Sequence, residues 1–145
     1  MSESNFWQHI KDNIGDIGDW DRIESHGTAP GFPDTDFTIG GVDGKIELKF
    51  HRGEGVPEIR DSQYRWFRRR AKKGCNCWLF AHFIYHQRDY YFLIRGDRLD
   101  QLNDVKDIAE YEARCDYVWF NEVVWHEFLH AITLNIISHG KKAPY

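Results

Sequence analysis

Two carboxylates and a lysine in the first third of the chain suit the hydrolysis of a phosphodiester. Side chains alternate between the two faces of a strand, so Glu47 and Lys49 in the run Ile46-Glu47-Leu48-Lys49 share one face. A hairpin turn near residues 40–41 would return Asp34 to the side of Glu47. Such a carboxylate pair favours Mg²⁺ or Mn²⁺, and the lysine would orient or deprotonate the attacking water or hold the phosphate. A solvated strand face is the alternative interpretation, and Asp36 is a further candidate ligand.

A second metal-binding pattern, His-Glu-x-x-His, lies near the end of the chain. On a helix, His126 and His130 would share one face and Glu127 would act as general base, as in zinc peptidases. The usual third ligand is missing, because no Glu follows Glu127 and Thr133 and Ile136 replace the Gly and His of one common continuation. The apolar residues around the motif also fit an amphipathic helix that packs on a sheet.

A basic run follows the proposed carboxylate site directly. Residues 45–73 carry ten Lys and Arg and four acids, a net charge of +6, whereas the stretches before and after them are net −7 and −3. A phosphodiester polymer needs cations near the scissile bond, although an ordinary solvated helix face would look the same. The predicted DNA contacts are Arg60, Arg65, Arg68, Arg69, Lys72 and Lys73, and Arg70 belongs to the same run.

Periodicity and turn residues predict the elements that must position these side chains. Apolar spacing predicts helices over 3–14 and 60–73, and two further helices over about 97–113 and 121–137. Strand patterns cover 20–25, 34–39, 45–50, 75–85 and 90–95, with Gly40 and Gly41 in a hairpin turn. This order predicts a single α/β domain over 1–145, with a core over about 3–95 and a helical extension over about 96–145.

Composition limits the functional classes. A chain of 145 residues with 41% hydrophobic and 16% aromatic residues forms a compact core and is not disordered. The net charge of −4 argues against a protein that coats nucleic acid by charge alone. The sequence lacks an apolar run of about 20 residues and a secretory signal, so we expect no membrane association and a cytoplasmic location. Three cysteines do not make a disulfide scaffold, which fits a reducing compartment.

Four short motifs occur in the order found in one nuclease superfamily. They are Arg22-Ile23-Glu24, Gly31-Phe32-Pro33-Asp34, Ile46-Glu47-Leu48-Lys49 and Gln63-Tyr64-Arg65-Trp66, the last on a helix that ends at Gly74. The sequence thereby resembles the PD-(D/E)xK nuclease superfamily over about two thirds of its length. It looks most like the small, often phage-encoded group related to VRR-NUC domains and Holliday-junction resolvases.

The resemblance implies a restriction-endonuclease-like mixed β-sheet flanked by helices, and a metal-dependent endonuclease that acts on DNA, with branched DNA as one candidate substrate. It implies that Asp34, Glu47 and the Leu48 carbonyl bind Mg²⁺ or Mn²⁺. Lys49 would be the catalytic lysine, Gln63 would approach from the helix, and Glu24 or Glu3 would supply a further acid. A phage enzyme would work in the cytoplasm of a bacterial host, and a junction-specific one as a homodimer, for which the aromatic residues Trp119, Phe120, Trp125 and Phe128 offer a surface. A catalytically inactive DNA-binding relative is the main alternative.

Overall fold

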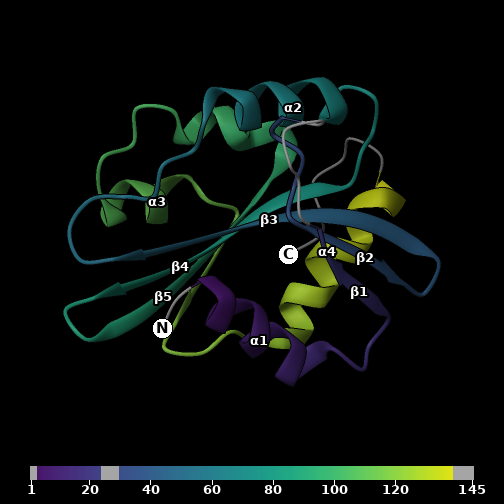
Figure 1. Cartoon of the computed structure of the whole chain (residues 1–145), viewed down its shortest axis with the longest axis horizontal. Coiled ribbons are helices and arrows are strands. Elements are labelled where there is room, and N and C mark those ends of the chain that lie inside the picture. The colour runs from purple at the N-terminus through teal and green to yellow at the C-terminus, as the bar shows by residue number, and fades with distance from the viewer. Residues whose placement is uncertain (1–2, 24–29, 139–145) are drawn as a thin grey trace.

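The computed structural model describes residues 3–23 and 30–138, which form a six-stranded sheet between two layers of helices (Figure 1). The strands lie side by side in chain order; β3 and β4 are parallel, and the other neighbouring pairs are antiparallel. The elements are α1 (Glu3–Ile14), β1 (Asp19–Arg22), β2 (Thr35–Ile39), β3 (Val42–Arg52), α2 (Asp61–Ala71), β4 (Cys77–Tyr85), β5 (Arg88–Arg95), the 3-10 helix η1 (Gly96–Leu102), α3 (Ile108–Arg114), β6 (Tyr117–Phe120) and α4 (Trp125–Ser138).

Helices α1 and α4 cover one face of the sheet (Figure 1). Phe6, Ile10 and Ile14 recur at helical spacing on α1 and are almost fully buried, as are Phe128 and Ala131 on α4. They pack against side chains from alternate positions of the central strands, which form a largely aromatic core. This core includes Phe37, Ile46, Leu48, Trp78, Phe80, Tyr91, Leu93 and Trp119.

Helices α2, η1 and α3 cover the opposite face (Figure 1). Trp66 and Phe67 of α2 and Tyr111 of α3 pack here against Leu79 and Phe83, which alternate with the residues of the first core along β4. Because both faces of β4 are covered, that strand is apolar almost throughout. This second core holds α2 over the sheet.

The β2–β3 hairpin turns at Gly40 and Gly41. Both glycines have positive φ, +55° and +84°, a conformation that a two-residue turn of this kind requires at both positions. The turn fixes the register, in which Ile39 pairs with Val42 and Thr35 with Ile46. The predicted hairpin is therefore confirmed, as are the predicted helices that correspond to α1 and α2.

The C-terminal third differs from the predicted helical extension. A single helix over 97–113 is wrong, because η1 and α3 occupy that stretch as two short helices. A sixth strand, β6, was not predicted; Tyr117 pairs with Leu93 of β5 and so extends the sheet. The stretch contributes residues to both cores and is part of one packed structure with the N-terminal two thirds.

None of the helices among the described residues is both long and apolar enough to cross a lipid bilayer. The three cysteines are free thiols; Cys77 is buried, and Cys75 and Cys115 are half-buried.

Candidate active site

The hairpin register places Asp34 directly before β2, opposite the middle of β3. Thr35 pairs with Ile46, so Asp34 lies next in line against Glu47. The Leu48 amide donates a hydrogen bond to Asp34 Oδ1 at 3.0 Å, and an Arg22 nitrogen lies 4.0 Å from Asp34 Oδ2. The Asp34 side chain keeps 19% of its surface exposed, which leaves it accessible to a ligand from solvent.

Strand alternation turns Glu47 and Lys49 toward α2. Their neighbours Ile46 and Leu48 enter the core beneath α1 and α4, so the two charged side chains occupy the other face. Glu47 is 6% exposed, and the Lys49 ammonium lies 3.6 Å from Glu47 Oε2. A carboxylate this deeply buried requires charged or hydrogen-bonding partners, and Lys49 is one of them.

Gln63 links the start of α2 to this pair. It is 2% exposed, donates from Nε2 to Glu47 Oε2 at 2.9 Å, and accepts at Oε1 from Lys49 Nζ at 3.0 Å. The same Oε1 also accepts from the Arg60 amide at 2.9 Å, which caps the first turn of the helix. One amide side chain thus fixes the helix end, the lysine and the carboxylate relative to one another.

A glycine lets the loop before Asp34 lie against α2. Gly31 has a φ of +82°, and a Cβ at this position would lie 2.0 Å from the Ser62 carbonyl oxygen. A larger residue would therefore push the loop away from the helix. The close approach brings Phe32 against Trp66 of the helix and Asp34 beside the Glu47–Lys49 pair.

The predicted residues Asp34, Glu47, Lys49 and Gln63 thus lie together. Asp36, the further candidate ligand, instead forms an ion pair with Lys45, its partner across the two strands. Glu24 lies outside the described residues, as does the side chain of Glu3.

The chemistry of these side chains fits a hard divalent cation. Mg²⁺ typically binds one or two protein carboxylates and keeps waters or substrate phosphate oxygens as its other ligands. Asp34 and Glu47 offer such a pair on adjacent strands, with the Leu48 backbone between them. Neither a thiol nor an imidazole contributes to this group, so its donor set favours Mg²⁺ or Mn²⁺ over zinc.

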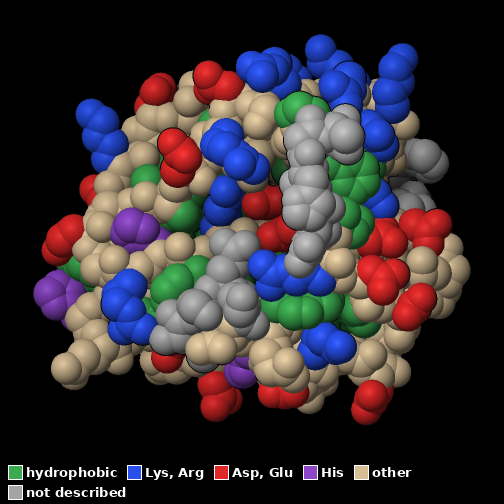
Figure 2. Space-filling view, in the orientation of Figure 1, with side chains coloured by type: hydrophobic (Ala, Val, Ile, Leu, Met, Phe, Trp, Pro, Cys, Tyr) green, Lys and Arg blue, Asp and Glu red, His purple; other side chains and the backbone are tan. Residues whose placement is uncertain are grey.

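Cations of α2 lie on different sides of the helix. Arg65, Arg69, Lys72 and Lys73 are exposed, as is Arg60 just before the helix. Figure 2 shows Lys and Arg side chains gathered along the edge of the molecule where α2 lies. This group includes most of the predicted DNA contacts.

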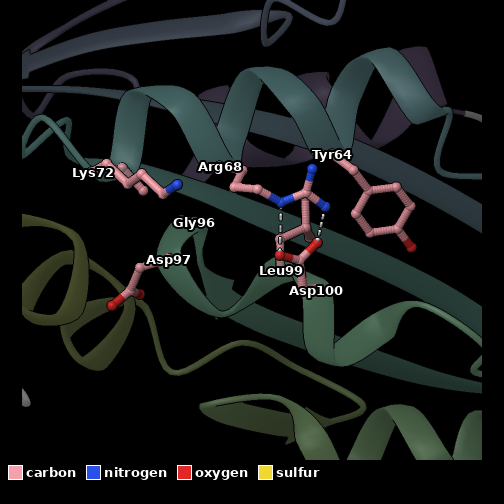
Figure 3. A pocket seen from close by; sticks show the side chains of 8 residues that line it. Tyr64, Arg68, Lys72, Gly96, Asp97, Leu99 and Asp100 are labelled. Carbon is pink, nitrogen blue, oxygen red and sulfur yellow. Dashed lines mark hydrogen bonds and ion pairs between the residues drawn. The ribbon is translucent and has the colours of Figure 1, made fainter.

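Arg68 differs from the other predicted contacts, because it already binds a carboxylate. Its Nη2 and Nε donate to the two oxygens of Asp100 on η1 at 2.7 and 3.1 Å (Figure 3). The pair borders a cavity of about 340 Å³ between α2 and η1, lined also by Tyr64, Lys72 and Asp97. Burial, with a smaller effect of Asp100, raises the pKa of Tyr64 to about 12. A phosphate at this position would have to compete with Asp100 for the guanidinium.

The His-Glu-x-x-His motif lies on the exposed side of α4. His126, Glu127 and His130 are all exposed, and Glu127 Oε1 accepts a hydrogen bond from Trp119 Nε1 at 2.9 Å. Within residues 3–23 and 30–138, no cluster of three or more His, Cys, Asp and Glu side chains is arranged to hold a metal ion. The helix packs on the sheet through Phe128, as an amphipathic helix would.

Comparison with known proteins gives a structural match only. No protein-family model matches the sequence, and no curated protein sequence does. Among solved structures, the chain is similar to Hjc, a Holliday junction resolvase from the archaeal hyperthermophile Archaeoglobus fulgidus. The TM-score is 0.52 at 13% sequence identity, over 76% of this chain and 92% of that chain. This likeness confirms the predicted fold class: a mixed α/β sheet flanked by helices, as in that resolvase.

Proposed function

We propose that the protein is a divalent-metal-dependent endonuclease that hydrolyses phosphodiester bonds of DNA and prefers branched DNA such as four-way junctions. The observation that carries the proposal is the hydrogen-bonded group of Glu47, Lys49 and Gln63 beside Asp34. Exposed cations lie on α2, the helix that carries Gln63. The fold shared with a Holliday junction resolvase supports DNA as the substrate and a branched form of it in particular.

Each residue of the site has its own role in the proposed reaction. Asp34 and Glu47 would hold Mg²⁺ or Mn²⁺ together with the Leu48 carbonyl, and the ion would supply Lewis-acid stabilisation of the phosphate charge. Lys49 lies 3.6 Å from Glu47, so its ammonium is positioned to orient the attacking water and hold a phosphate oxygen. Gln63 keeps the lysine and the carboxylate at a fixed separation through its two hydrogen bonds.

A cleavage assay tests this function. The purified protein is incubated with single-stranded, duplex and four-way-junction DNA in the presence of Mg²⁺, Mn²⁺ or a chelator. We expect cleavage that needs the metal, is fastest on the junction, and is lost in Glu47→Gln and Lys49→Met. Arg114→Gln, a distant charge change on α3, serves as the control and should cleave normally. Cleavage that survives Glu47→Gln would refute the assignment, and salt-dependent binding without cleavage would favour an inactive DNA-binding relative.

Resolution of a junction needs two symmetrical cuts, so the proposal includes a homodimer. Half of the predicted aromatic surface for it is wrong, because Trp119 and Phe128 are buried in the core, and Trp125 is partly buried against the same core. Phe120, on the edge strand β6, remains 53% exposed. Sedimentation equilibrium should show a dimer at the concentration at which junction cleavage is measured, and a monomer there would argue against paired cuts.

A further inference from the structure

Two cations lie within about 6 Å of one aromatic ring beside the site, Phe32. The Phe32 ring packs edge-on against Trp66, with ring centroids 5.3 Å apart and planes at 69°. The Arg70 guanidinium lies 5.0 Å from the Trp66 centroid and 6.0 Å from that of Phe32, and the Lys45 ammonium lies 5.6 Å from Phe32. These separations are typical of cation–π contacts, which hold a charged head group in one place.

Arg70 and Lys45 lie on the same side of the sheet as Glu47, Lys49 and Gln63. Arg70 follows Gln63 by seven residues, which at 3.6 residues per turn places the two within about 20° of each other around α2. Trp66 and Phe67, buried between them, mark this as the inner face of the helix. Lys45 precedes Glu47 by two residues on β3 and so points to the same side of the sheet.

The other cations of α2 lie elsewhere around the helix. By the same geometry, Arg65 and Lys72 lie about 160–180° from Gln63, and Arg69 about 120° from it. Arg70 lies roughly 10 Å from Gln63 along the helix axis but on the same face, whereas a phosphate on the outer face would have the helix itself between it and Glu47. The outer face therefore suits attraction of the polymer as a whole better than placement of one phosphate.

Among the described residues, no carboxylate offsets the charge of Arg70, which can therefore bind an anionic ligand. Lys45 is paired with Asp36, and Arg68 with Asp100, but no carboxylate of the described residues lies within ion-pair distance of Arg70. Its guanidinium packs against the two aromatic rings, and the residue is exposed. A planar guanidinium in this setting has its donor edge available for the two oxygens of a phosphate.

We propose that Arg70, supported by Phe32 and Trp66, binds a backbone phosphate of the DNA strand that is cut, adjacent to the scissile one. This assignment rests on the proposed nuclease function. It makes Arg70 the substrate-positioning cation of the inner face, and it leaves Arg65, Arg69 and Lys72 as less specific contacts.

Binding of a fluorescently labelled four-way junction, measured by anisotropy in the presence of a chelator, tests the assignment without any need for catalysis. Arg70→Gln should raise Kd about tenfold and reduce the dependence of log Kd on log salt by about one. Arg69→Gln makes the same charge change on the outer face and should raise Kd less than about threefold. Arg70→Lys keeps the charge but lacks the planar donor edge, so its Kd should lie between those of Arg69→Gln and Arg70→Gln.

Equal Kd values for Arg70→Gln and Arg69→Gln, with a wild-type protein that binds and cleaves, would overturn this assignment alone. A wild-type protein that binds no DNA would overturn the proposed function as well. Thermal unfolding of each variant checks the fold. If Arg70→Gln is unstable, the wild-type protein gives a second test, because the junction should slow iodoacetamide labelling of Cys75, whose electrostatic partners include Lys45 and Arg70. Labelling that DNA does not change would contradict the assignment.

Discussion

Gln63 is the side chain on which the geometry of the site depends most. It joins Glu47, Lys49 and the first turn of α2 through three hydrogen bonds of 2.9–3.0 Å.

Strand alternation and the glycine turn were sufficient to predict that Asp34, Glu47 and Lys49 would come together, because both are local rules. The contacts of Phe32, Lys45 and Arg70 were not predictable in this way, since they depend on how α2 packs over the sheet.

Replacement of Gln63 by Met keeps its size and removes its hydrogen bonds. We expect Gln63→Met to lower the free energy of unfolding by about 1–3 kcal/mol, because it leaves buried polar partners unsatisfied. The cleavage rate should fall on the order of 100-fold at a temperature where the variant is folded, since Lys49 loses its position. Gln101→Met, at an exposed site on η1, is the control. Wild-type cleavage by Gln63→Met would exclude a positioning role.

Cys75 reports on the electrostatics beside the site. A hydrogen bond with the Cys77 thiol, with help from the Lys45 and Arg70 charges, lowers the pKa of Cys75 to about 7. Iodoacetamide, which reacts with the thiolate, should therefore label Cys75 with a midpoint near pH 7, and Arg70→Gln should move this midpoint upward. Burial raises the pKa of Cys115, so that thiol should react far more slowly in the same sample. A Cys75 midpoint near the ordinary thiol value of 9.0 would contradict the described contacts.

Elements formed by local rules were predicted well, and those formed by long-range pairing were not. Helix α1 has the predicted bounds of 3–14, because its apolar spacing and the glycine that follows it are both local signals. Strand β6 has only four residues and lies between two helical patterns, so its identity comes from pairing with β5. The short helices η1 and α3 likewise depend on packing against α2 and the sheet.

Packing of α4 on the sheet makes a clear prediction about stability. Phe128 is fully buried, and its ring centroid lies 4.6 Å from that of Phe80. Phe128→Ala should lower the free energy of unfolding by about 3–5 kcal/mol, as measured by denaturant titration. Val124→Ala, at a position that is 38% exposed on the same segment, should change it by less than about 0.5 kcal/mol. Equal effects would mean that α4 is not part of the core.

The buried histidine of β4 predicts how stability depends on pH. His82 is fully buried, stacks on Tyr91 and hydrogen-bonds Asp89 at 2.7 Å. Burial lowers its pKa below 6.5, although the bond to Asp89 acts in the opposite direction. The unfolded chain therefore takes up a proton that the folded protein does not, and stability is lost as the pH falls through about 6.5.

Replacement of His82 by Phe should accordingly weaken the fall in Tm between about pH 7 and pH 5. The phenyl ring keeps the stacking, while Asp89 is exposed enough to be solvated when it loses its partner. His126→Phe, on the exposed side of α4, is the control and should leave the wild-type pH dependence in place. An identical dependence in His82→Phe and the wild type would refute the linkage.

The distribution of charge over the protein is compatible with the proposed binding of DNA by a net acidic chain. The total of −4 combines an acidic N-terminal stretch, which supplies Asp34, with the basic α2 region. Ion pairs with Asp36 and Asp100 neutralise Lys45 and Arg68, so the exposed positive charge is concentrated on fewer side chains than the sequence alone indicates. The proposed binding to DNA should therefore be local, and its dependence on salt should reflect the few free cations of α2 and not all ten of the basic stretch.

Everything proposed for catalysis depends on a divalent metal ion held by Asp34 and Glu47. Anomalous diffraction from crystals soaked in Mn²⁺ locates such an ion directly. We expect an anomalous peak between the carboxylates of Asp34 and Glu47, and no peak there in Glu47→Gln crystals soaked in the same way. A peak between His126 and His130, with none beside Asp34 and Glu47, would contradict the account and favour the zinc-peptidase alternative.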